Sequence, residues 1–449
     1  MASKKQRMSR EQVLSMAQNL GNNAQSPEPL KVNESFSEKS DFSTLQVFQE
    51  MESHRSIADL VGLRNPFFHQ IEGRAGPTVS IGGKDYINFS SYDYLGLNFQ
   101  DEVAEAAKDA IDQYGTSVSA SRPTAGNRPI HRALEEQLAD LYQADDALVF
   151  VSGHSTNVST IGDFLGPKDL VLYDALSHNS IIVGTKLSGA TRKSFRHNDL
   201  ADLENHLQQS RYQYDRVLIV VEGLYSMDGD LPDLVGLVDI KSRFGAWLMV
   251  DEAHSLGVLG DSGRGIFEHA GVDPRQIDIW MGTLSKTLCG CGGYIAGNGV
   301  LIEILKYQAS GFMYSVGIPA PVTAASMRAL QLMQQQPERI QRLQANGKMF
   351  LKTAQQAGLD TGNSQGYSVV PIIIGDSLRT VKMCNLLMEK GIFSIPVTYP
   401  AVTMQQARIR FFITSEHSRE QIVYTIETMA ALLKELQNQS FGLSEILGE

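Results

Sequence analysis

The sequence has few cysteines, no long apolar run and no excess of positive charge. Three cysteines are too few for a disulfide framework or a four-cysteine metal site, so we expect reduced thiols and no bound metal. No segment approaches about 18 consecutive apolar residues, and the polar N-terminus lacks the apolar stretch of a signal peptide. We therefore expect no transmembrane segment and a cytoplasmic location. The formal net charge of -11 argues against a general nucleic-acid surface, although a local basic patch for a phosphorylated ligand stays open.

At 449 residues the chain is long enough for two or three domains. Residues 1–45 are polar and poor in large apolar side chains, which predicts a linker or extension rather than part of a core. Within it, residues 9–12 have the spacing of a capping box, and apolar residues recur at helical intervals up to Leu20. This pattern predicts one short amphipathic helix at residues 9–20.

From about residue 100, short apolar runs alternate with segments of helical length. Runs that are apolar on both faces are typical of a parallel sheet covered by helices, which predicts an α/β fold with a mainly parallel central sheet. After about residue 325, longer helical patterns surround the apolar runs at 369–374 and 408–413, which predicts a smaller C-terminal α+β domain. We therefore expect an N-terminal arm at 46–100, a large domain at 101–325 and a small domain at 326–449.

Polar and ionisable residues follow five of the predicted strands. They occupy positions 152–154, 174–178, 222–228, 251–254 and 283–286. Because ligands of open α/β sheets bind outside the carboxyl ends of the strands, these residues form the candidate site.

Lys286 stands between two hydroxyl residues in the stretch GTLSKT. A phosphate-binding loop is excluded, because Ser285 occupies the place of that motif's second glycine. A solvated surface lysine is the plain alternative, and the DEAH stretch that begins at Asp251 is by itself more often structural. Together, however, a strand-end aspartate and a strand-end lysine suit pyridoxal 5'-phosphate, which needs a lysine amine for its Schiff base and a carboxylate beside its pyridine nitrogen.

Seven spaced motifs give the chain a family resemblance from about residue 55 to 435. It resembles the α-oxoamine synthases, which are fold-type I pyridoxal-phosphate transferases. The motifs are LGL at 95–97, GTSVSASRPTAGNRPIHRALE at 115–135, SHNS at 177–180, SMDGD at 226–230, DEAHSLGVLGDSGRG at 251–265, GTLSK at 282–286, and YPAV with ARIR at 399–410.

The resemblance implies a role for each matching residue. Lys286 would be the Schiff-base lysine, and Asp251 the partner of the pyridine nitrogen. His178 would stack on the ring and polarise the thioester carbonyl, and Arg410 would hold the substrate carboxylate. The remaining cofactor contacts would be Ser226 and His254 at the phenolic oxygen, and Thr283 with the backbone amides of Gly153 and His154 at the phosphate.

Three positions depart from the family pattern. Asp93 precedes Tyr-Leu-Gly-Leu where the family usually has asparagine, which puts that residue's contact to the substrate in doubt. In the family, a serine and often a second hydroxyl residue reach the cofactor phosphate in the partner subunit. Here Ser315 is followed by valine, so only one hydroxyl is present. His154 replaces the usual aromatic residue after Gly153.

The resemblance implies a decarboxylative condensation of a small amino acid (Gly, Ala or Ser) with an acyl thioester, carried out by a homodimer with shared active sites. The alternatives are another fold-type I reaction such as transamination, or a non-catalytic partner subunit, although such subunits lack the lysine.

The polar extension before the family match leaves two hypotheses. In the first, the chain is an excised module or a partner of a carrier-protein assembly line, such as a polyketide or fatty-acyl off-loading module. The extension then holds a docking helix or an upstream domain beside the site, and the acyl donor is bound to the phosphopantetheine arm of an acyl-carrier protein rather than to free CoA. In the second, the extension is a tail without a role.

Overall fold

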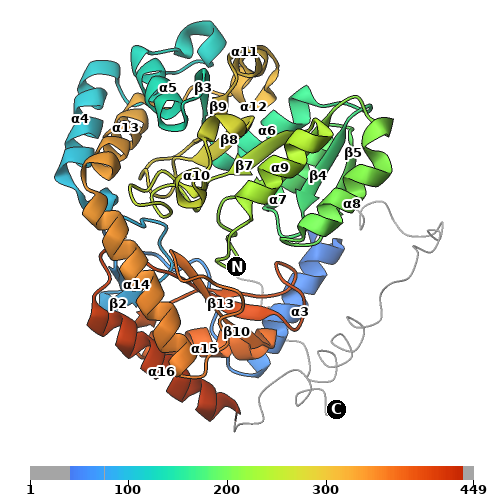
Figure 1. Ribbon diagram of the computed structural model, residues 1–449. Coiled ribbons are helices and arrows are strands. Elements are labelled where there is room, and N and C mark those ends of the chain that lie inside the picture. The colour runs from blue at the N-terminus through green and yellow to red at the C-terminus, as the bar shows by residue number, and fades with distance from the viewer. Residues whose placement is uncertain (1–40, 75, 438–449) are drawn as a thin grey trace. The chain divides into compact units, whose positions relative to one another are not determined.

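The computed structural model describes residues 41–74 and 76–437 (Figure 1). The helix predicted at residues 9–20 lies outside the described residues. The chain divides into two compact units: unit 2 contains residues 71–372 and 410–426, and unit 1 contains the remaining segments. The domain boundaries expected from the sequence stay predictions. No helix within 41–74 and 76–437 combines the length and apolar character needed to cross a membrane.

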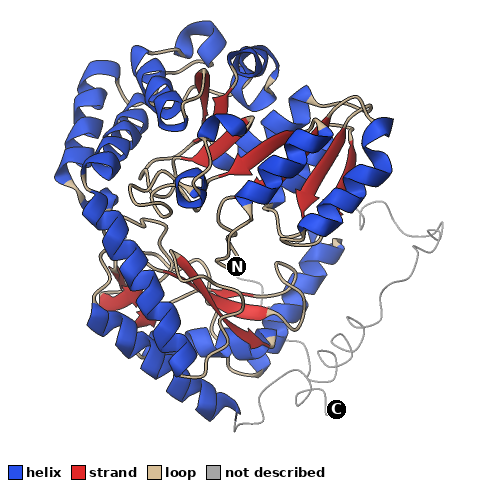
Figure 2. Ribbon diagram, viewed as in Figure 1, coloured by secondary structure: helices blue, strands red, loops and turns tan. Residues whose placement is uncertain are grey.

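Unit 2 is built on a seven-stranded sheet with the order β3-β9-β8-β7-β6-β4-β5. Figure 2 draws the strands in red and the helices in blue. Strand β9 runs antiparallel to both of its neighbours, and the other paired strands run parallel. The mainly parallel sheet predicted from the sequence is thereby confirmed. The strands are β3 Asp146–Phe150, β4 Leu170–Asp174, β5 Thr191–Phe195, β6 Val217–Glu222, β7 Trp247–Asp251, β8 Ile279–Thr283 and β9 Gly293–Gly297.

Both faces of this sheet are buried. On one face, alternate strand residues such as Val171, Val220 and Met249 pack into a core with Ile161 of α6 and Ile181 of α7. The opposite face carries an aromatic cluster, in which the ring of Trp280 stacks on Tyr142 at 4.9 Å and packs against Phe267 at 5.5 Å. Burial on both faces explains why the central strands are continuous apolar runs.

The helices of unit 2 connect the strands and follow the sheet. They are α4 Asp101–Tyr114, α5 Pro129–Tyr142, α6 Gly153–Phe164, α7 Asn179–Leu187, α8 Leu200–Ser210, α9 Leu234–Phe244, α10 Ile266–Ala270, α11 Gly299–Gln308, α12 Ser310–Met313, α13 Ala320–Gln335 and α14 Pro337–Gln356. Unit 2 also holds an antiparallel pair of strands, β1 Thr78–Ile81 and β2 Lys84–Asn88.

Unit 1 contains helices α3 Gln46–Leu60 and α15 Ser377–Glu389 and the short strands β11 Ile392–Phe393 and β12 Pro396–Val397. The division between the units falls within three elements, β10 Val369–Gly375, β13 Ala407–Phe412 and α16 Arg419–Gln437. Strands β10, β13 and β12 form a sheet of their own, in that order.

Candidate active site

The site predicted at the strand ends lies within unit 2. Because β3, β4, β6, β7 and β8 run in the same direction, their carboxyl ends share one edge of the sheet. The register pairs Glu222, the last residue of β6, with Asp251, the last residue of β7. Lys286 lies in the loop that follows β8. Two carboxylates and an amine are thus brought to neighbouring strand ends.

Lys286 is partly buried, and this burial lowers the pKa of its amine to about 8, although Asp251 and Glu222 favour the charged form. Its Nζ atom lies 5.7 Å from the centre of the Tyr92 ring. A lysine with a pKa near neutrality has a substantial uncharged fraction, so it can act as a nucleophile or as a base.

Asp251 is buried, and the fold fixes both of its carboxylate oxygens. Oδ2 accepts a 2.8 Å hydrogen bond from Nδ2 of Asn157, and Oδ1 accepts one of 2.9 Å from the backbone N–H of Ala253. Asn157 lies on α6 and also donates to Ser180 Oγ at 3.0 Å. The sheet edge therefore presents an oriented buried carboxylate, which is costly to maintain without a partner.

His178 caps the N-terminus of α7, and its backbone N–H donates to Oε1 of Glu222 at 2.6 Å. Its Nδ1 lies 2.7 Å from Ser180 Oγ, which orients the ring. Burial lowers the pKa of His178, although Asp251 acts in the opposite direction. Because its pKa is lowered, the imidazole of His178 is uncharged at neutral pH. Burial and the neighbouring Asp251 raise the pKa of Glu222 to about 8.

The start of α6 offers a place for an anion. Ser152 caps this helix, whose first residues are Gly153 and His154, and the first N–H groups of a helix have no partners within it. A Cβ atom at Gly153 would come within 2.8 Å of Thr283 Oγ1, so only glycine allows this close approach of helix and loop. Thr283 Oγ1 is held by a 2.9 Å hydrogen bond that it donates to the carbonyl of Gly292.

His254 is buried beside aromatic side chains that the sequence analysis did not assign to the site. Its Nδ1 lies 2.7 Å from the hydroxyl of Tyr94, and its ring stacks on Phe412 at 6.3 Å. Burial lowers the pKa of His254 well below its ordinary value, and the charges of Lys286 and Arg410 add to this effect. His254 is therefore neutral and has one ring nitrogen available.

In the described part of the chain, the guanidinium of Arg410 is hydrogen-bonded through a terminal nitrogen but not through its Nε. One terminal nitrogen donates to the carbonyl of Ser226 at 2.8 Å, and the guanidinium carbon lies 4.6 Å from the centre of the Phe412 ring. Its Nε is buried without a hydrogen-bond partner among the described residues. A buried orphan donor on a cation is what a carboxylate ligand would satisfy.

Asp93 and Ser315 are two further residues of the predicted site. The carboxylate of Asp93 accepts hydrogen bonds from the backbone N–H groups of Leu97 at 2.9 Å and Asn98 at 3.2 Å, and burial raises its pKa to about 6. These contacts fit a role in holding the turn. Ser315 lies in a segment whose neighbour Tyr314 is 85% exposed.

The residues missed by the sequence analysis are Asn157, Ser180, Tyr92, Tyr94 and Phe412. One signal was available for Asn157, because it lies one helical turn after Gly153 and so faces the same side of α6.

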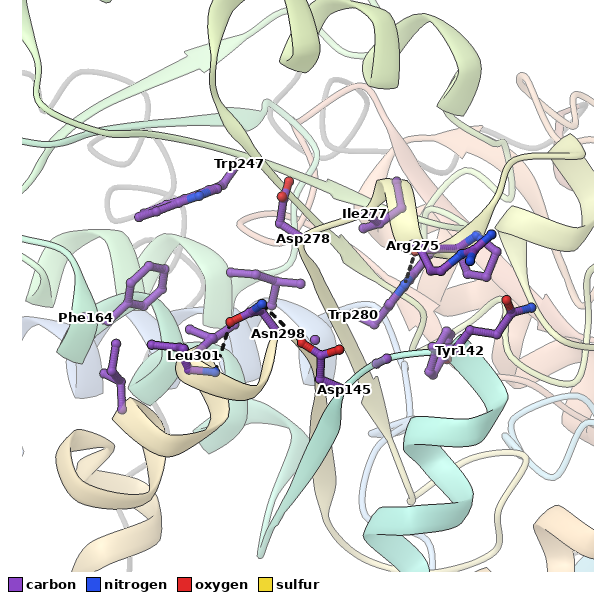
Figure 3. Close-up of a pocket in the computed structure, with 17 residues that line it drawn as sticks. Tyr142, Asp145, Phe164, Trp247, Arg275, Ile277, Asp278, Trp280, Asn298 and Leu301 are labelled. Carbon is purple, nitrogen blue, oxygen red and sulfur yellow. Dashed lines mark hydrogen bonds between the residues drawn. The ribbon is translucent and has the colours of Figure 1, made fainter.

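A cavity of about 540 Å³ lies at the other edge of the same sheet (Figure 3). Trp247 and Ile279, which line it, begin β7 and β8, whereas the candidate site lies where these strands end. Its polar groups are paired within the fold: Asn298 donates to Asp145 at 3.1 Å, and Lys241 donates to Asp278 at 2.7 Å. We therefore do not place the chemistry in this cavity.

Comparisons with known proteins bear on the same site. A family model described as aminotransferase class I and II matches residues 84–429. The 8-amino-7-oxononanoate synthase 1 of Bacillus velezensis is 39% identical over 368 residues, covering 82% of this chain and 93% of the relative. The 4-hydroxy-2,2'-bipyrrole-5-methanol synthase of a Serratia species is 38% identical over 351 residues, covering 78% of this chain and 53% of the relative. A solved structure of serine palmitoyltransferase from Sphingomonas wittichii has a TM-score of 0.84 and 27% identity, covering 89% of this chain and 100% of that chain.

Proposed function

The chain belongs to the aminotransferase class I and II family and, within it, to the α-oxoamine synthases, and from this premise we propose which residues perform the reaction. The enzyme condenses an amino acid with an acyl thioester. The net reaction joins the α-carbon of the amino acid to the acyl carbon, releases the thiol, and releases the amino acid's carboxyl group as carbon dioxide. One observation carries the assignment of residues: Lys286, whose pKa is lowered, lies at the same edge of the sheet as the fixed carboxylate of Asp251 and the start of α6.

Pyridoxal 5'-phosphate is the cofactor of this enzyme, and the residues present fit it. Asp251 offers a buried carboxylate for the pyridinium, and the first N–H groups of α6, which begins at Gly153 beside Thr283, would receive the phosphate. When bound, the cofactor supplies an electron sink for the charge that develops on the α-carbon.

Lys286 and Asp251 divide the proton chemistry. The uncharged amine of Lys286 takes the proton from the α-carbon, which its lowered pKa allows near neutral pH. Asp251, with both oxygens fixed by Asn157 and Ala253, would keep the proton on the pyridine nitrogen of the bound cofactor. One residue thus moves a proton, and the other holds one in place.

Arg410 binds the carboxylate of the amino acid. Its contact to Ser226 fixes the direction of the guanidinium, and the orphan Nε provides a donor for the substrate. Because a planar guanidinium can bind both oxygens of a carboxylate, Arg410 sets the orientation of the α-carbon toward the Lys286 amine.

The remaining residues position the cofactor and the thioester. His178, uncharged and oriented by Ser180, would flank the ring of the bound cofactor and donate to the thioester carbonyl. Because Nδ1 of His254 is taken by Tyr94, its Nε2 would be the atom that bonds the phenolic oxygen of the bound cofactor, together with the hydroxyl of Ser226.

The reaction is tested by the mass of its product. We expect an α-amino ketone when the holoenzyme is given one of Gly, Ala or Ser and acyl-CoA donors of increasing length. The amino acid and chain length that give the highest kcat/KM identify the substrates. Absence of any α-amino ketone across the panel, with cofactor bound, would contradict the proposal.

We propose that the acyl donor is carried by an acyl-carrier protein. Two observations favour this: residues 1–45 precede the family match, and the match covers only 53% of the Serratia relative, so relatives of this chain include longer proteins. We expect a higher kcat/KM for an acyl-carrier-protein donor than for the matched acyl-CoA, and a loss of this preference when residues 1–45 are removed. Equal values for both donors, unaffected by the truncation, would contradict the idea.

We further propose a homodimer with shared active sites, in which the segment around Ser315 completes the phosphate site of the partner. The exposure of Tyr314 and Val316, at 85% and 52%, fits a segment that a second copy covers. Mixing an inactive Lys286→Ala protomer with an inactivated Ser315→Ala protomer should restore activity, because one site of the mixed dimer is then intact. Mixtures without restored activity, at proven subunit exchange, would contradict sharing.

A further inference from the structure

A partly buried histidine outside the residues described above bridges two carboxylates. Nδ1 of His197 lies 2.8 Å from Oδ1 of Asp174, and its Nε2 lies 2.8 Å from Oδ2 of Asp230. Both aspartates are buried. Because a carboxylate accepts hydrogen bonds, the bridge requires both ring nitrogens to donate, and His197 is then a cation. Burial alone would lower the pKa of His197, but the hydrogen bonds to the two aspartates raise it to about 10.

The next residue strengthens the same bridge. The backbone N–H of Asn198 donates to Oδ2 of Asp174 at 2.9 Å, and its side-chain amide donates to Oδ2 of Asp230 at 3.0 Å. Asn198 adopts a left-handed backbone conformation with φ of 54°, which asparagine tolerates better than most residues. The pair His197-Asn198, after β5, thus joins the end of β4 to the loop that follows β6.

The two joined segments carry site residues. Asp174 ends β4, and its carbonyl accepts from Ser177 at 3.0 Å, next to His178. Asp230 closes the loop after β6, because its carbonyl accepts from the N–H of Tyr225 at 3.0 Å.

Ser226 lies within this closed loop, and its carbonyl holds the guanidinium of Arg410 at 2.8 Å. The ring of Tyr225 also meets His197 edge-on at 4.5 Å. A shift of the loop would therefore move the acceptor that directs Arg410.

We propose that His197 is a positioning residue for the amino-acid site: by bridging Asp174 and Asp230 it fixes the loop whose Ser226 carbonyl directs Arg410. This inference rests on the function proposed above, since it takes Arg410 as the carboxylate clamp. His197 itself touches none of Lys286, Asp251 or Arg410 in the contacts that the described residues show, so its effect passes through the loop.

The test compares His197→Gln with the double variant His197→Gln/Asp230→Asn. In the parent, the cluster holds one positive and two negative charges, a net charge of -1. The single variant leaves two buried carboxylates without a cation. The double variant restores the net charge of -1 and places two amides where they can form a hydrogen bond with each other. In the single variant we expect the dissociation constant of the preferred amino acid, measured by calorimetry on the holoenzyme, to rise about tenfold or more. The KM for the acyl thioester should stay nearly unchanged, and the double variant should recover most of the lost affinity.

His131→Gln is the control, because His131 is a buried histidine of the same unit that bonds backbone groups, at Arg128 and Ile318, rather than carboxylates. It should lower Tm without changing amino-acid affinity. A folded His197→Gln enzyme with the parent's amino-acid dissociation constant would overturn the proposal, as would an equal loss of affinity for both substrates.

If His197→Gln does not fold, the same two measurements on Asp230→Asn test the proposal. A raised amino-acid dissociation constant with unchanged thioester KM supports the proposal, and an unchanged dissociation constant overturns it. A parent enzyme that binds the amino acid but releases no carbon dioxide would contradict the proposed reaction instead, while the binding measurement still tests His197.

Discussion

Lys286→Ala is expected to lower thioester-dependent release of carbon dioxide by about 1,000-fold or more, because it removes the base that takes the α-proton. Burial lowers the pKa of Lys286 to about 8. For the same reason, we expect that an amine dissolved in the buffer does not substitute for the missing side chain in the variant. Sodium borohydride reduction followed by peptide mass spectrometry should place the cofactor on Lys286 in the parent and on no peptide in the variant.

Lys241→Ala is the control for this prediction. Lys241 belongs to the same unit but pairs with Asp278 at 2.7 Å, at the edge of the sheet away from the site. The control should keep the parent's rate. A Lys286→Ala enzyme with a rate comparable to that of Lys241→Ala would refute the role of Lys286.

Asp251→Asn is expected to lower kcat by about 100-fold, because an amide cannot supply the negative charge that keeps the pyridine nitrogen protonated. In the parent, Asn157 and Ala253 each donate to one carboxylate oxygen of Asp251. In the variant, the NH2 group of the new amide faces one of these two donors, and that hydrogen bond is lost. Single-turnover rates at saturating cofactor separate the loss of chemistry from a loss of cofactor.

Glu252→Gln is a stringent control, because it changes the neighbouring buried carboxyl group. Burial raises the pKa of Glu252 to about 8, so at pH 7 the substitution replaces one neutral group by another. Glu252 accepts from Ser255 and Ile266, away from the expected pyridine contact. Equal losses in both variants would show that the Asp251 effect is one of packing.

The central strands could be predicted because each is a continuous apolar run. The runs at 147–150, 170–173, 217–221 and 247–250 lie within β3, β4, β6 and β7. Two strands gave no such signal. Residues Gly293–Gly297 of β9 follow a glycine-rich stretch that is typical of turns, and Thr191–Phe195 of β5 is an edge strand with two adjacent charged residues and one buried apolar residue.

From pattern alone, the site could be predicted where its residues end a strand or lie in the loop after it. Lys286, Asp251 and His178 have that position, and parallel strands bring such residues to one edge, whereas Arg410 lies within β13 and was assigned through the family resemblance. Tyr94 and Phe412 come from segments that are distant along the chain and reach His254 through packing, which spacing does not encode. The bridge made by His197 was missed for the same reason.

The most direct test of the central claim follows the fate of an amino acid labelled at its carboxyl carbon. If Lys286, Asp251 and Arg410 catalyse a decarboxylative condensation, labelled carbon dioxide and free thiol should appear in equal amounts, and neither should form without the other substrate. Release of thiol without labelled carbon dioxide would show thioester hydrolysis, and transfer of the amino group to a keto acid without any thioester would show transamination. Either result would contradict the account.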